Sequence, residues 1–200
     1  SPTFTSSADA ITFTGGRVLL TDGTFTVNSN SGVITIGDIK GTDEDNVTLN
    51  AGTADSTDAT VTVGAIGAGN KIAIVSITGN DGVTLNGSIT TEDASNAAVT
   101  VASGSGTITL GTDITIDTNV TNNDGDITLG SIDATTDHGQ ALTIDSGTGA
   151  VSIGVIGGTE QLDGLTVNTA DGASNSGNIT IAGIGGVTAT YGVVGTVAVG

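Results

Sequence analysis

Carboxylates are the most abundant ionisable side chains of this 200-residue chain, which has 21 Asp and Glu against three Lys and Arg and one His. Hydrolysis or elimination on a polysaccharide would need clustered carboxylates and a basic partner in one cleft. The basic candidates Arg17, Lys40, Lys71 and His138 fall in different parts of the sequence, and most acids lie in turn-like segments. We therefore predict a protein without catalytic residues, with a polysaccharide-active enzyme kept as an alternative.

A divalent cation is the one cofactor that the sequence suggests. The segment Asn122-Asn-Asp-Gly-Asp126 places oxygen donors at alternate positions around a Gly, as loops that bind hard cations do. It lacks the later Glu of an EF-hand and the Gly-rich nonapeptide of calcium-binding repeats. Asn122, Asp124 and Asp126 are therefore candidate Ca²⁺ ligands, and a plain turn is the alternative.

Triads in which a hydroxyl side chain stands between two large apolar residues recur along the chain, and eight of them lie about one period apart. The central residues of these triads are Thr12, Thr35, Thr62, Thr84, Thr109, Thr128, Ser152 and Thr180. We predict that they form one outward ladder of hydroxyls. Such a ladder could order water and bind ice, although Thr is also an ordinary outward residue of a β-surface.

The spacing of the triads indicates the elements that carry them. The central residues are 23, 27, 22, 25, 19, 24 and 28 residues apart, and a period near 24 is typical of a repeat protein in which each unit supplies one rung. Alternation puts the aliphatic residues on one face of a strand and Thr on the other. We predict an all-β protein, a right-handed parallel β-solenoid (β-helix) of about 7–8 rungs and roughly 35 Å in length.

One rung can be followed through residues 141–164, where two short strands joined by a Ser-Gly-Thr-Gly corner precede a further inward residue, Ile156. Equivalent inward residues are expected at Ile39, Ile66, Ile89, Ile114, Ile132, Ile156 and Ile184, and the number of sides per rung stays open. The predicted organisation is one domain over residues 1–200. Its parts are a first rung or cap (1–24), regular rungs (25–186) and a partial terminal rung or stacking end (187–200).

Tandem β-sandwich domains are the alternative fold, because they also contain many short strands. A sandwich needs large residues between its sheets, yet Phe4, Phe13, Phe25 and Tyr191 all lie near the two ends of the chain. These aromatic residues could close the first and last rungs of a solenoid or simply fill wider ones.

Composition excludes several classes of function. A formal net charge of −18 argues against binding to nucleic acid or to anionic membranes. There is no Cys for disulfides and no apolar run long enough for a membrane span. Because Met is absent even at position 1, we expect a processed part of a longer precursor.

Four Asn residues match the N-glycosylation pattern Asn-x-Ser/Thr: Asn46, Asn86, Asn119 and Asn178. Chance matches are expected in a chain this rich in Asn and Thr. They are candidate sites only if the source organism glycosylates its surface proteins.

One pattern repeats along the chain in variants such as Val-Thr-Leu-Asn-Ala-Gly (47–52), Ile-Thr-Leu-Gly (108–111), Leu-Thr-Ile-Asp-Ser-Gly-Thr-Gly (142–149) and Ile-Thr-Ile-Ala-Gly-Ile-Gly (179–185). Over residues 11–186 the chain resembles the β-strand repeats of giant bacterial surface proteins, similar to filamentous-haemagglutinin-type adhesins and autotransporter passengers. The resemblance implies a right-handed parallel β-helix that serves as an extracellular stalk. No haemagglutinin-type secretion cap is recognisable in the N-terminal residues.

Together these observations predict an extracellular structural or adhesive protein, a rigid cell-surface shaft or filament subunit. The strand-like sequence at Val194–Gly200 predicts either end-to-end self-association or continuation in a longer chain. Surface glycans or host or abiotic surfaces are further expected partners.

Overall fold

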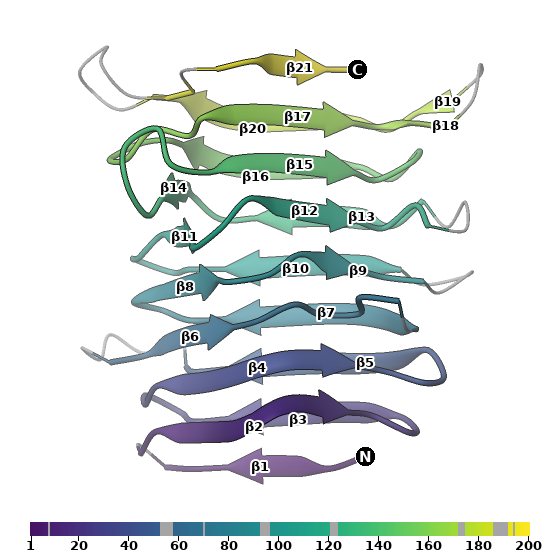
Figure 1. The fold of residues 1–200 in the computed structure, drawn as a ribbon, viewed down its shortest axis with the longest axis vertical. Helices are drawn as coiled ribbons and strands as arrows, with labels where there is room; N and C mark the ends of the chain where they lie inside the picture. Colours follow the sequence, from purple (N-terminus) through teal and green to yellow (C-terminus); the bar gives the residue numbers. More distant parts are fainter. Residues whose placement is uncertain are drawn as a thin grey trace.

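The chain winds into a right-handed parallel β-solenoid, in which the nearer strands run from left to right and the fainter, more distant strands return while the chain climbs from N to C (Figure 1). This computed structural model describes residues 1–7, 9–52, 58–69, 71–92, 97–120, 124–171, 175–185, 192–193 and 195–200. Within them, strand pairing forms three parallel ladders, so each turn has three sides. The predicted fold class is confirmed.

The three ladders define three faces of the rod. Face 1 consists of β1 (Thr3–Thr5), β3 (Thr24–Asn28), β5 (Asp45–Asn50), β7 (Ile72–Thr78), β10 (Ala98–Ala102), β13 (Asp126–Leu129) and the first parts of β16 (Val151–Ile156) and β20 (Ile179–Ile184). Face 2 consists of the first parts of β2 (Ile11–Leu19) and β4 (Ile34–Lys40), then β6 (Thr60–Val63), β8 (Gly82–Leu85), β11 (Ile108–Leu110), β14 (Ile132–Ala134) and the ends of β16 and β20.

Face 3 consists of the ends of β2 and β4, then β9 (Ile89–Thr90), β12 (Ile114–Asp117), β15 (Ala141–Asp145), β17 (Gly164–Asn168) and β21 (Val197–Val199). Single bridges at Ile66 connect β4 to β9. A short antiparallel pair, β18 (Ala170–Asp171) and β19 (Asn175–Ser176), stands apart from the three faces.

Alternating apolar residues explain the interior. In β5, for example, buried and half-buried residues alternate, and buried Leu49 lies in register with Val27 below and Ile77 above. Each of these three side chains is 0% exposed. Full burial of such an aliphatic side chain contributes roughly 1.5–3 kcal/mol. Because every turn adds similar residues to the same column, the rod holds a continuous aliphatic core without large rings in its middle.

The corner between faces 3 and 1 is closed by buried hydroxyls. Thr118, Ser146 and Thr169 each follow a strand of face 3 and lie one above another, and all three are at most 1% exposed. Their side-chain oxygens donate to the carbonyls of Gly125 (2.7 Å), Gly149 (2.9 Å) and Gly177 (3.2 Å). Each hydroxyl therefore fastens the end of a corner loop to its beginning.

Three phenylalanines close the N-terminal end of the rod. The rings of Phe4, Phe13 and Phe25 meet edge to face, with centroids 5.1–6.0 Å apart. Phe25 is buried, whereas Phe4 is 43% exposed on the end turn. The cluster therefore covers the N-terminal end of the aliphatic column. The fourth aromatic residue, Tyr191, lies outside the described residues.

The projecting loops change corner along the rod. In the N-terminal half, segments such as 29–33, 79–81 and 103–107 separate face 1 from face 2, but only Gly130 and Ser131 separate β13 from β14, and β16 and β20 turn this corner without interruption. In that C-terminal half the longer segments, 135–140 and 157–163, leave the corner between faces 2 and 3 instead.

This change corrects one prediction. The seven expected inward isoleucines do not form one row: Ile39, Ile66, Ile89 and Ile114 lie on face 3, and Ile132, Ile156 and Ile184 lie on face 2. Ile184 is also 48% exposed, because it lies on the last turn of face 2. Each turn still passes from face 1 to face 2 and then to face 3, but the long loop lies at a different corner in the two halves of the rod.

Candidate functional site

An unbroken line of hydroxyls runs along the outside of face 1. Strand pairing places its members directly above one another through eight successive strands, and we call them the hydroxyl column: Thr3, Thr26, Thr48, Ser76, Thr100, Thr128, Ser152 and Thr180. Neighbouring strands of a sheet lie about 4.8 Å apart. The column therefore presents hydroxyls at a regular spacing along the whole rod.

The prediction of a single hydroxyl ladder is wrong, because its eight members lie on two different faces. Thr12, Thr35, Thr62, Thr84 and Thr109 do stack, but they do so on face 2, and the next residue above Thr109 is Asp133. The last three predicted members, Thr128, Ser152 and Thr180, belong to the hydroxyl column of face 1. The 19-residue step between Thr109 and Thr128 marks this change of face.

Ser76 is a member of the hydroxyl column that the sequence reasoning missed. It lies between Val75 and Ile77 in a seven-residue strand, with Thr48 below and Thr100 above. The available signal was its own triad, Val-Ser-Ile, which matches that of Ser152.

Charge is nearly absent from the outer side of face 1. Among the half-buried and exposed residues of its described strands only Asp126 is charged, and the others are mostly Thr, Ser, Asn and Ala. Face 3, by contrast, carries Arg17, Asp38, Asp117 and Asp145 in its strands. Face 1 is therefore a neutral hydrogen-bonding surface on a strongly acidic rod.

Two of the three predicted calcium ligands accept hydrogen bonds from the next turn of the rod. Asp124 Oδ1 accepts a hydrogen bond from the Thr148 backbone N–H (2.9 Å), and Asp126 Oδ1 accepts one from the Ala150 N–H (2.8 Å). Asn122 lies outside the described residues. Within the described ranges no three Asp, Glu, His or Cys side chains are grouped to hold a metal ion. The Ca²⁺ site stays a prediction.

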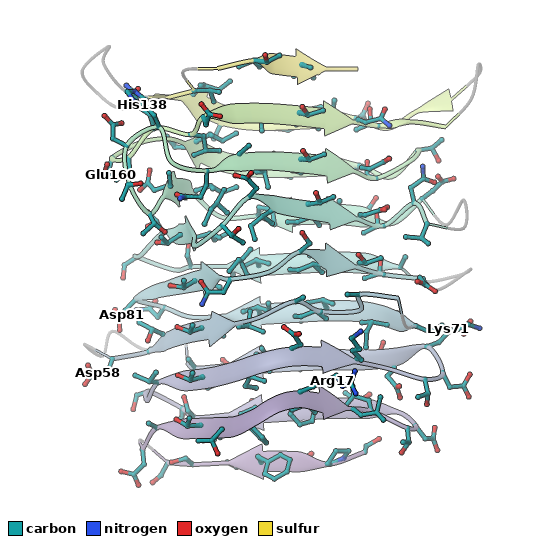
Figure 2. The ribbon with its side chains drawn as sticks, in the orientation of Figure 1. Arg17, Asp58, Lys71, Asp81, His138 and Glu160 are labelled. Atoms are coloured by element: carbon teal, nitrogen blue, oxygen red, sulfur yellow. The ribbon has the colours of Figure 1, made fainter. Side chains whose placement is uncertain are left out.

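The basic side chains lie far apart. Figure 2 shows Arg17 on the lower turns, Lys71 at one edge and His138 at the opposite edge near the C-terminal end. Lys71 Nζ is 4.0 Å from Glu44 Oε1, and His138 Nε2 pairs with Gln161 Oε1. Each contact is local to neighbouring loops, so these residues do not come together around one group of carboxylates.

The four candidate glycosylation sites differ in accessibility. Asn86 and Asn178 are exposed. Asn46 is half-buried, with its Oδ1 accepting the Ile74 N–H (3.1 Å), and Asn119 is half-buried, with its Nδ2 donating to Asp145 Oδ1 (3.4 Å). Asn86 and Asn178 are therefore the better candidates for attachment of a glycan.

No protein-family model, no curated protein and no solved structure matches this chain. Among the residues that the structure describes, no helix is long and apolar enough to cross a membrane. What the chain does is therefore inferred from its geometry.

Proposed function

We propose that this chain is an extracellular structural protein, a rigid shaft of the cell surface that holds an adhesive or anchoring part at a distance. The carrying observation is the continuous stack, in which three parallel ladders extend along the described rod. Backbone hydrogen bonds between turns point along the axis, as in Ser29 N to Asn50 O (2.9 Å) and Thr118 N to Asp145 O (2.9 Å). Bending the rod would stretch such bonds on one side, and this gives the shaft its stiffness.

The surface suits a shaft exposed to water. With a net charge of −18, neighbouring rods repel one another, and this opposes lateral aggregation. The end turn near the C-terminus presents Ile184, Val197 and Val199, which are 48%, 47% and 52% exposed. In this proposal a further solenoid turn covers these strand edges, and either a second copy or a longer chain supplies it.

A shaft should accept extra turns. Residues 26–47 form one complete turn, because Thr26 pairs with Thr48 in the next turn. Inserting a second copy of 26–47 after Val47 is expected to lengthen the rod by about 4.8 Å and to leave the melting temperature unchanged or higher, since each turn contacts only its neighbours. Small-angle X-ray scattering gives the length, and circular dichroism gives the melting temperature.

The matched control omits the last residue of the inserted turn. A copy of 26–46 shifts the register of the following strand by one residue, so its aliphatic side chains would face outward. This control is expected to melt at a lower temperature than the in-phase insertion. If both insertions destabilise the rod equally, the chain is not a modular shaft.

Ice binding is the second candidate, and the hydroxyl column is the observation that favours it. Eight stacked hydroxyls on a neutral face could hold an ordered layer of water. The candidate requires thermal hysteresis of the wild-type chain, and Thr100→Tyr on face 1 should abolish it while Thr84→Tyr on face 2 should not. A solution of the wild-type chain without hysteresis rules out this function.

A further inference from the structure

The C-terminal half of face 2 contains a groove of about 530 Å³. Its lining comprises Thr107, Ser131, Asp133, Val155, Gly158, Thr159, Ala182, Gly183 and Gly185. A second hollow of about 360 Å³ adjoins it at Ser131 and extends over the corner to Thr100 and Thr128 of face 1. Volumes of this size are those of sites for small organic ligands.

The groove exists because the loops change corner. Segment 103–107 projects between β10 and β11, whereas Gly130 and Ser131 turn the same corner closely in the next turn of the rod. Segment 157–160, at the corner between faces 2 and 3, also borders the groove, since Gly158 and Thr159 line it. The rest of the lining comes from the strands and the close corner of the later turns, with small residues such as Ser131, Ala182 and Gly183.

Asp133 is the strongest polar group of the groove. Its residue is only 6% exposed, and its Oδ1 accepts hydrogen bonds from the backbone N–H groups of Thr159 (2.9 Å) and Glu160 (3.4 Å). Its other oxygen, Oδ2, accepts no hydrogen bond from the described residues. A carboxylate that is fixed through one oxygen thus lies in the lining of an open groove, and its other oxygen has no hydrogen-bond donor among the described residues.

We propose that this groove binds a neutral oligosaccharide. A carboxylate oxygen accepts hydrogen bonds from sugar hydroxyls, and these bonds are stronger than those between neutral groups. Thr107, Ser131 and Thr159 add hydroxyls that both donate and accept, and Val155 offers an apolar contact for a sugar ring. Oligosaccharide binding in this groove is compatible with the shaft function but does not depend on it.

The negative charge of the groove lining favours neutral sugars over anionic ones. The groove lining contains the acid Asp133 and no Lys, Arg or His. A uronic-acid chain would place its carboxylates against Asp133 without a compensating cation, so anionic glycans are disfavoured. A neutral hexose chain meets no such repulsion.

The structure offers a substitution that fills the groove at little cost to the fold. A Cβ added at Gly183 would meet only Val155 Cγ2, at 3.9 Å, so Gly183→Leu should place its side chain in the groove without a clash at Cβ. Gly164→Leu on face 3 is the matched control, because its Cβ would also make only ordinary contacts, of 3.6 Å and 3.7 Å.

A second pair of variants tests the carboxylate. Asp133→Asn keeps an oxygen for the two backbone N–H groups but removes the charge. Asp126→Asn is its control, because Asp126 likewise accepts a backbone N–H of the next turn, that of Ala150, but lies on face 1.

The test is saturation-transfer NMR with cellohexaose, maltohexaose and mannohexaose, and with hexagalacturonate as the anionic comparison. We expect transfer to at least one neutral hexasaccharide and none to hexagalacturonate. Affinity should fall at least tenfold in Gly183→Leu and about tenfold in Asp133→Asn, with both controls near wild type. Failure of all three neutral sugars to bind, or unchanged binding in both groove variants, overturns the proposal. Either result leaves the turn-insertion experiment, and so the shaft, untouched.

Discussion

The Leu49→Asp chain is expected to melt at least about 10 °C below the wild type, or not to fold at all. Leu49 is 0% exposed and lies in the aliphatic column between Val27 and Ile77. A carboxylate at this position would lose its hydration and would find no cation or hydrogen-bond donor among those side chains. Such a penalty of several kcal/mol corresponds to a large shift in melting temperature for a chain of this size.

The control for this variant is the adjacent residue. Thr48 carries its side chain on the outer side of the same strand, between Thr26 and Ser76. Thr48→Asp keeps its charge in water and is expected to change stability by no more than about 0.5 kcal/mol. Thermal melts followed by circular dichroism compare the two. Equal melting temperatures would falsify the inward orientation of Leu49 and, with it, the aliphatic column.

Inward and outward positions could be predicted from the sequence because strand geometry alone determines them. Side chains alternate between the two sides of a strand, so the triad Val47-Thr48-Leu49 already assigns its Thr to the outside. The buried and half-buried pattern of β5 agrees with this assignment. The solenoid followed from the same alternation combined with a period near 24 residues.

The face to which each triad belongs could not be predicted, because it depends on which corner carries the loop. The sequence shows that residues are inserted between triads, but an insertion has the same appearance at any corner. Only two residues separate Leu129 from Ile132, and this short interval was the available sign that β13 and β14 occupy adjacent faces. The row of Thr on face 2 therefore continues above Thr109 with Asp133, whereas Thr128 and the later predicted members lie on face 1.

The groove residue Asp133 was missed for the same reason. In the sequence it is one of several acids in a turn-like segment, which predicts a solvated carboxylate. In the structure it occupies the position above Thr109 in face 2, and the backbone N–H groups of Thr159 and Glu160 donate hydrogen bonds to it. Its burial results from a neighbouring turn that lies 26 residues away in the chain, and no local pattern encodes that contact.

The second large loss of stability is expected from substitution of glycine at the corner between faces 3 and 1, where successive turns stack closely. Gly125, Gly149 and Gly177 succeed one another at this corner, where a Cβ on each would strike the backbone of the turn before it. At Gly149 the added atom would lie 2.4 Å from Gly125 O and 2.6 Å from Gly125 C. Backbone cannot rotate away as a flexible side chain can, so the two turns would have to separate.

Gly149→Ala is therefore expected to cost about 2–3 kcal/mol, within the range for overpacked sites, and to weaken the nearby bond from Ser146 Oγ to Gly149 O. Gly164→Ala adds the same methyl group on face 3, where its nearest neighbour would be Ala141 Cβ at 3.6 Å. It should leave stability unchanged or raise it slightly, since Ala restricts the unfolded chain. Urea denaturation measures both variants. If Gly149→Ala proves as stable as Gly164→Ala, the turns at this corner are not in backbone contact, and the rod is packed more loosely than a stiff shaft requires.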